Sequence, residues 1–173
     1  MTEQIQDSPI AIPPSSIQEN VEAKLRLEGQ LKNGASWFYW IAILSLINSI
    51  LFMSGSTFGF IFGLGITQLF DSIGTELADD FGFGAKVFAF LFNCIIAAVY
   101  IVFGIFSNKR ITAVCIIGLV LYALDGALCL LAQDWLSVAF HAFAVFSIFK
   151  GLQAGMQLNK IPAVSQQPIA SVC

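Results

Sequence analysis

The chain has 173 residues, of which 57% are hydrophobic, 17 are phenylalanine and only 11% are charged. A soluble domain of this length would carry charge on about a quarter of its residues. The apolar residues form long runs, and runs of about 18 or more are typical of helices that cross a bilayer roughly 30 Å thick. The basic residues form no stripe, which excludes a nucleic-acid partner. The composition therefore predicts an all-α integral membrane protein.

The polar N-terminal part divides into a tail and a helix. Residues 1–15 contain three prolines among small and polar residues, and we expect a disordered tail there. Ser16 and Glu19 have the spacing of a capping box, and Gly34, preceded by asparagine, is a typical helix end. These signals predict an amphipathic juxtamembrane helix over residues 16–34 that lies on the membrane surface. A frayed polar linker is the alternative, because isolated helices of this length are marginal.

A membrane domain with four apolar runs is predicted over residues 35–156. The predicted spans cover about 36–54, 85–106, 111–132 and 135–155. Very short links join the last three runs, and short links force neighbouring helices to be antiparallel. We therefore expect an antiparallel four-transmembrane-helix bundle, followed by a loose C-terminal tail over residues 157–173.

The segment between the first and second spans is less regular. Residues 58–70 are apolar but interrupted by glycines, and thirteen residues are too few for a standard span. Apolar and acidic residues then alternate at helical spacing as far as Asp80. The segment is predicted to be interfacial, which we favour, or re-entrant and tucked against the spans. Irregular backbone at membrane depth must be covered by protein or water.

The distribution of basic residues predicts the orientation. With the N-terminus inside, seven basic residues lie on the inner side and only Lys86 lies outside. The seven are Lys24, Arg26, Lys32, Lys109, Arg110, Lys150 and Lys160. Cytoplasmic segments of membrane proteins carry the excess of Lys and Arg. A fifth span at 58–70 would leave four on each side, so we predict a multi-pass protein with both termini cytoplasmic.

Each predicted span carries a strongly polar residue at a similar depth. From a rise of about 1.5 Å per residue, Asn48, Asn93, Asp125 and His141 lie about 9–12 Å below the outer surface. Tyr122 is one helical turn before Asp125 and shares its face. An ionised Asp deep in a lipid-facing helix costs about 2.5–3.5 kcal/mol. Asp125 must therefore be protonated, pair with cationic His141 or be reached by water, and we expect an outward-facing polar pocket.

Three functions fit this pocket, because ionisable groups inside a membrane are functional candidates. The first is a small structural or partner-binding membrane protein. The second is a transporter or a proton- or cation-responsive subunit that uses Asp125 and His141. The third is a membrane-embedded enzyme, which we do not expect because no nucleophile is placed beside the histidine. No cofactor or metal is expected either, since zinc would lack two ligands, with only Cys94 or Cys129 as further donors.

A helix-packing motif lies at the C-terminal end of the fourth predicted span. Gly151 and Gly155 form a Gly-x-x-x-Gly pattern, which lets helices approach closely. Packing within the bundle is favoured over a homo-oligomer seam. The expected partners are the lipid bilayer and either a second copy or another membrane protein.

Several short segments resemble an uncharacterised family of small bacterial four-span integral membrane proteins. These segments are Gly-Ala-Ser-Trp-Phe-Tyr-Trp-Ile-Ala at 34–42, Leu-Ser-Leu-Ile-Asn-Ser at 44–49, Gly-Leu-Gly-Ile-Thr-Gln at 63–68, Leu-Asp-Gly at 124–126, Asp-Trp at 134–135 and Phe-His-Ala-Phe at 140–143. The resemblance covers about residues 34–155. It implies a bacterial inner-membrane protein with four spans, and it assigns no catalytic residues.

Overall fold

The computed structural model describes residues 14–55 and 63–161, and within these ranges it contains five helices and no strand. The helices are α1 (Pro14–Met53), α2 (Gly65–Phe81), α3 (Phe83–Asn108), α4 (Thr112–Leu131) and α5 (Trp135–Lys160). All except α2 are long and apolar enough to cross a membrane, so the described residues contain four candidate spans, as predicted. The predicted tails lie mostly outside the described residues, although residues 14–15 and 157–160 are helical.

Helix α1 joins the predicted surface helix and the first span without a break. Its 40 residues correspond to about 60 Å, twice the apolar thickness of a bilayer. The predicted helix end at Gly34 is therefore wrong. Gly34 lies against α5, where an added Cβ would be 2.6 Å from the Cα of Gly151. Gly155 also faces α1, since its Cβ would be 3.2 Å from Cδ1 of Leu31, so both glycines of the packing motif adjoin α1.

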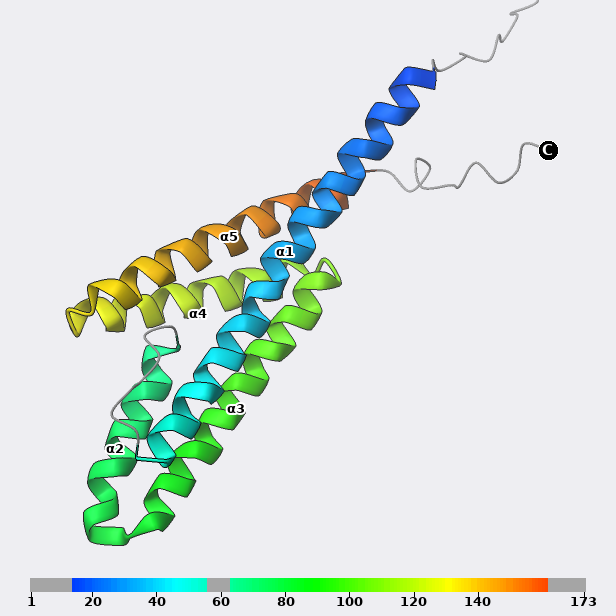
Figure 1. Ribbon diagram of the computed structural model, residues 1–173. Coiled ribbons are helices and arrows are strands. Elements are labelled where there is room, and N and C mark those ends of the chain that lie inside the picture. Colours follow the sequence, from blue (N-terminus) through cyan, green and yellow to red (C-terminus); the bar gives the residue numbers. More distant parts are fainter. Residues whose placement is uncertain (1–13, 56–62, 162–173) are drawn as a thin grey trace, which may run out of the picture.

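The four long helices form two antiparallel pairs, α1 with α3 and α4 with α5 (Figure 1). The pairs meet near the α3–α4 turn and diverge away from it, so that the body resembles a V (Figure 1). Helix α1 packs against both α3 and α5, and it holds the two pairs together where they cross. The predicted antiparallel bundle is thus splayed open at one end, and α2 occupies the open side of the V (Figure 1).

Helix α2 is tucked against α3, as the re-entrant alternative requires, and its first turn approaches α4 (Figure 1). Its buried face carries Thr67, Asp71 and Gly74. The last of these permits close packing, because a Cβ on Gly74 would be 2.7 Å from the Cβ of Ala89 on α3. The first part of the predicted 58–70 segment, residues 58–62, lies outside the described residues.

The hydrophobic core lies where the helices cross. Phe38 and Ile41 of α1 meet Tyr100 of α3, Tyr122 of α4 and Ile148 of α5, and all five are at most 5% exposed. Large apolar side chains cover the outer faces of α3, α4 and α5, as in helices that face lipid. The core therefore fixes the crossing of the V and leaves its open side to polar contacts.

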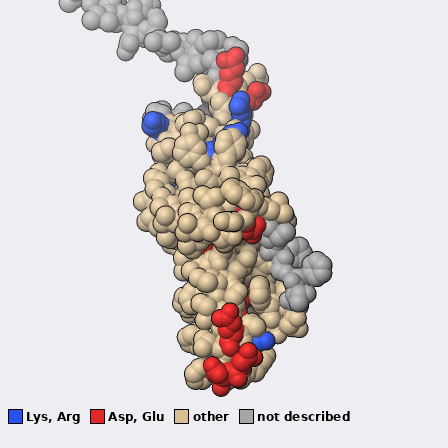
Figure 2. All heavy atoms as spheres, turned by 90° about the vertical axis from the view of Figure 1, so that its left-hand side faces the viewer, with Lys and Arg blue, Asp and Glu red and all other residues tan. Residues whose placement is uncertain are grey.

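Charged side chains gather at the two ends of the molecule (Figure 2). Arg110 in the α3–α4 turn pairs with Glu28 of α1 at 3.0 Å. The opposite end, formed by the C-terminal part of α2, exposes Glu76, Asp79 and Asp80. Figure 2 shows basic and acidic side chains together at one end, mainly acidic side chains at the other, and a largely uncharged surface between them.

Candidate functional site

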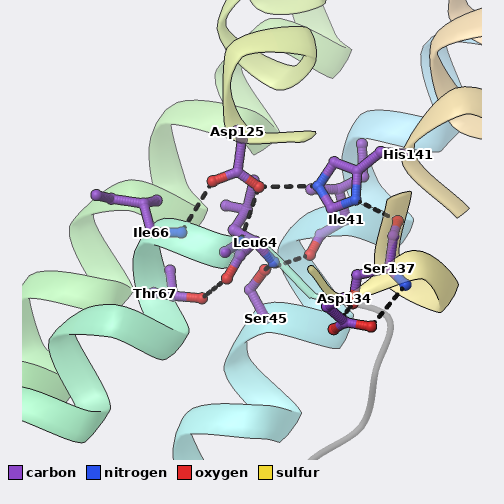
Figure 3. A network of polar contacts seen from close by, with 10 residues as sticks. Ile41, Ser45, Leu64, Ile66, Thr67, Asp125, Asp134, Ser137 and His141 are labelled. Carbon is purple, nitrogen blue, oxygen red and sulfur yellow. Dashed lines mark hydrogen bonds and ion pairs between the residues drawn. The ribbon is translucent and has the colours of Figure 1, made fainter. Parts of the chain in front are cut away.

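The start of α2 is capped by a side chain from another helix. The first N–H groups of a helix have no partner within it, and Leu64 offers no side-chain cap. The N–H of Gly65 donates to Oδ2 of Asp125 at 2.8 Å, and that of Ile66 donates to Oδ1 at 2.9 Å (Figure 3). Asp125 on α4 thus accepts from two consecutive amides. The carboxyl group also faces the positive end of the α2 dipole, which would stabilise a negative charge there.

Helix α1 holds the same turn from the other side. The N–H of Leu64 donates to the hydroxyl oxygen of Ser45 at 2.9 Å, and this hydroxyl donates to the carbonyl of Ile41 (Figure 3). The hydroxyl of Thr67 donates back to the Leu64 carbonyl at 2.8 Å. Three consecutive amides at the start of α2 are therefore satisfied by α1 and α4 together. The helix start links the two arms of the V.

His141 of α5 completes the contacts of Asp125. Its Nε2 is 2.9 Å from Oδ2 of Asp125, and its Nδ1 is 2.7 Å from the carbonyl oxygen of Ser137 (Figure 3). A carbonyl oxygen only accepts, so Nδ1 carries a hydrogen. A hydrogen must then lie between Nε2 and Oδ2, carried by either the imidazole or the carboxyl group, or a cation must take its place. The Tyr122 ring stacks on the imidazole at 4.5 Å.

The orientation of His141 depends on the first turn of α5. Asp134 is the N-cap of this helix, and it accepts from both the hydroxyl and the N–H of Ser137 (Figure 3). These hydrogen bonds hold the pKa of Asp134 below its usual range, with the Ser137 hydroxyl as the main cause. The cap fixes the backbone that presents the Ser137 carbonyl to His141.

A second polar cluster lies about one turn further along the buried side of α2, around Asp71. Oδ2 of Asp71 accepts from the hydroxyl of Ser49 at 2.7 Å, and Oδ1 accepts from the amide of Asn93 at 2.8 Å. The same amide nitrogen is 3.1 Å from the carbonyl oxygen of Thr67. Oδ1 of Asn93 is fully buried and has no partner among the described residues. This cluster ties α2 to α1 and α3.

The five predicted pocket residues are all at most 5% exposed, but they do not form one group. Asp125, His141 and Tyr122 meet, whereas Asn93 bonds to Asp71 and its neighbours. Asn48 lies beside Gly63, where a Cβ would be 2.5 Å from the Asn48 amide nitrogen. Residues at equal depth do not converge because the helices that carry them diverge.

Sequence reasoning did not place Asp71 in the polar site, and it named Cys129 only as a possible further zinc donor. Asp71 was expected on the polar face of an interfacial helix, yet it is 5% exposed. The sequence signal for this burial is that Asp71 shares a helix face with the small or polar residues Thr67 and Gly74. Cys129 lies one turn after Asp125, and its thiol, an Asp125 oxygen and a nitrogen of His141 lie within 4.8 Å of one another. Its i,i+4 spacing from Asp125 is the signal that favours it over Cys94.

An open groove of about 580 Å³ adjoins Asp125 between α3 and α4. Its lining is hydrophobic apart from that residue: Ile66, Phe92, Ile95, Ile96, Val99, Tyr100, Leu121, Leu124, Ala127, Leu128 and Leu131. Such a lining favours an apolar occupant over a column of water. The polar partners of Asp125 are therefore the two α2 amides and the imidazole.

The chain matches no protein-family model, no curated protein and no solved structure. The resemblance to small bacterial four-span proteins stays a prediction. The geometry itself allows two kinds of chemistry at Asp125, namely fixing a helix start and holding a cation.

Proposed function

We propose that this chain is a structural or partner-binding integral membrane protein in which Asp125 and His141 fix helix α2 against the spans. The carboxylate of Asp125, which accepts from two α2 amides and faces the imidazole, is the observation that supports this role. Hydrogen bonds to charged groups contribute about 1.5–3 kcal/mol each. Three such contacts can offset the cost of about 2.5–3.5 kcal/mol for placing an ionised Asp at this depth.

The α2–α3 hairpin is the proposed contact surface for a partner protein or a second copy. The excess of basic residues at the opposite end supports a cytoplasmic α3–α4 turn, with both chain ends cytoplasmic. A bacterial inner membrane is what the resemblance to small four-span proteins implies. The hairpin then faces the outer side and exposes Glu76, Asp79 and Asp80 there. Anchoring by Asp125 would hold this surface in one position, which lowers the entropy lost on binding a partner.

Hydrogen exchange of the α2 amides in purified protein tests the anchoring role. In Asp125→Leu the amides of Gly65 and Ile66 lose their acceptors, and we expect exchange in the first turn of α2 to rise at least about tenfold, equivalent to about 1.4 kcal/mol. Asp125→Asn should lie between Asp125→Leu and wild type, because its amide keeps one acceptor oxygen. Leu124→Ala, a change of an exposed neighbour on α4, is the control. Unchanged exchange in Asp125→Leu would refute the role.

A second candidate is a transporter or a proton- or cation-responsive subunit, and one observation supports it. The contact of 2.9 Å between Nε2 of His141 and Oδ2 of Asp125 places a hydrogen between two ionisable groups. In proteoliposomes with a pH gradient, Asp125→Asn should abolish a proton flux that the wild-type chain supports. A wild-type chain without flux above empty vesicles would exclude proton transport.

A membrane-embedded enzyme is the weakest candidate. The hydroxyls of Ser45, Ser49 and Ser147 donate to the Ile41 carbonyl, to Asp71 and to the Phe143 carbonyl. Each of these serine hydroxyls is thus engaged away from His141, which a serine nucleophile would need as its base.

A further inference from the structure

Three side chains with different ligand atoms converge beside the start of α2. Asp125 and Cys129 lie one turn apart on α4, and His141 faces them from α5. A carboxylate oxygen, the Cys129 thiol and an imidazole nitrogen lie within 4.8 Å of one another, and all three residues are buried. Carboxylate, thiolate and imidazole are the ligands that zinc takes in proteins. The Cys129 thiol has no part in the capping of α2.

The surroundings of these ligands match those of a metal site. A histidine that binds a metal usually donates its other N–H to a carbonyl or carboxylate, and Nδ1 of His141 donates to the Ser137 carbonyl at 2.7 Å. The lone pair at Nε2 therefore points toward Asp125, where a cation would meet it. Ligating carboxylates are themselves hydrogen-bonded, and Asp125 accepts from Gly65 and Ile66.

Charge balance favours a divalent ion at this depth. A thiolate and a carboxylate together carry two negative charges, and a neutral imidazole adds none. One divalent cation makes the site neutral, which avoids the cost of an unbalanced charge inside a membrane. A thiolate and an imidazole favour zinc over magnesium or calcium, which prefer oxygen ligands.

We propose that Asp125, Cys129 and His141 bind a zinc ion that joins α4, α5 and the start of α2. The bond lengths of zinc place neighbouring ligand atoms about 3.3–3.6 Å apart. The 2.9 Å contact between Asp125 and His141 widens slightly on binding, and the Cys129 thiol moves inward by about 1 Å at most. Three protein ligands leave a fourth position for water or another small ligand. The buried Tyr122 hydroxyl, which lacks a partner among the described residues, lies on the ring that stacks against His141.

Cobalt is the probe for this site, because it replaces zinc and reports its ligands by absorption. The full chain is purified without a histidine tag, stripped with a chelator and titrated with Co²⁺ in detergent micelles. We expect one Co²⁺ per chain, with the visible bands of a tetrahedral site and a thiolate-to-cobalt charge-transfer band. Zn²⁺ should displace the cobalt and abolish both features.

Replacement of one cysteine at a time tests whether Cys129 is a ligand. Loss of a second-shell group costs about 10–100-fold in metal affinity, so Cys129→Ala should weaken Co²⁺ binding at least about 100-fold and remove the charge-transfer band. Cys94→Ala, at a half-buried thiol on α3, should change neither. His141→Gln should also weaken binding, and helix content by circular dichroism verifies that each variant folds. No charge-transfer band in the wild-type chain, or a band that persists in Cys129→Ala, would overturn the proposal.

Discussion

Replacement of Gly34 by alanine should separate α1 from α5. The added Cβ would lie 2.6 Å from Cα and 3.0 Å from N of Gly151, and 3.1 Å from the carbonyl oxygen of Ser147. All three contacts are backbone atoms, so no side-chain rotation relieves them, and the helices must move apart by about 1 Å. Overpacking of this kind costs about 1–3 kcal/mol, and we expect the upper end. The higher helix propensity of alanine offsets about 1 kcal/mol of this, so the free energy of unfolding should fall by about 2 kcal/mol.

The matched control is Gly29→Ala, which introduces the same change five residues earlier in the same helix. An added Cβ at Gly29 meets nothing within 4 Å, so this variant should gain about 0.5–1 kcal/mol of stability from helix propensity alone. Both variants are unfolded by titration with a denaturing detergent and followed by circular dichroism. If Gly34→Ala is as stable as Gly29→Ala, then α1 and α5 are not in close contact at Gly151, and the reasoning fails.

Two other predictions concern the capped helix starts. Asp134→Ala should lower the free energy of unfolding by about 1 kcal/mol, because the N-cap of α5 is lost. The pKa of Asp134 lies below its usual 3.8 in the folded state. Its contribution to the free energy of unfolding is therefore present above pH 3.8 and is lost as the pH falls through the lower folded-state pKa. Parallel curves of unfolding free energy against pH for wild type and Asp134→Asn would contradict this. Gly65→Ala should destabilise the wild-type chain, since its Cβ would be 2.9 Å from the Cys129 sulfur, but should be nearly neutral in a Cys129→Ala background. A double-mutant cycle measures this coupling, and additive effects would rule out the contact.

The four spans could be predicted because length and apolarity are properties of a single run of residues. Helices α3, α4 and α5 begin and end within a few residues of the predicted limits, except that α5 continues to Lys160. The continuity of α1 could not be predicted in the same way. Gly34 has the local signature of a helix end, yet its small size is needed for contact with Gly151, which is more than a hundred residues away.

The polar site was predictable only in part. Depth along a span follows from residue count, and this was enough to place Asp125 and His141 at one level. Whether polar side chains at one level meet also depends on how the helices cross and on the direction in which each side chain points. The V-shaped arrangement brings Asn93 to Asp71 on α2 instead of to Asp125, and a hydropathy pattern holds no information about that crossing.

The donors that Asp125 uses explain why a search among side chains could not complete the site. Two of its three partners are backbone N–H groups at Gly65 and Ile66, and such groups are free only where a helix begins. An acid in a later span and a glycine-flanked helix start in an earlier segment are therefore two halves of one feature. Neither half is sufficient alone, because a buried helix start lacks acceptors and a buried carboxylate lacks donors. In a chain with few charges, an acid within a predicted span that has no basic partner in the sequence thus indicates a short helix that starts inside the membrane domain.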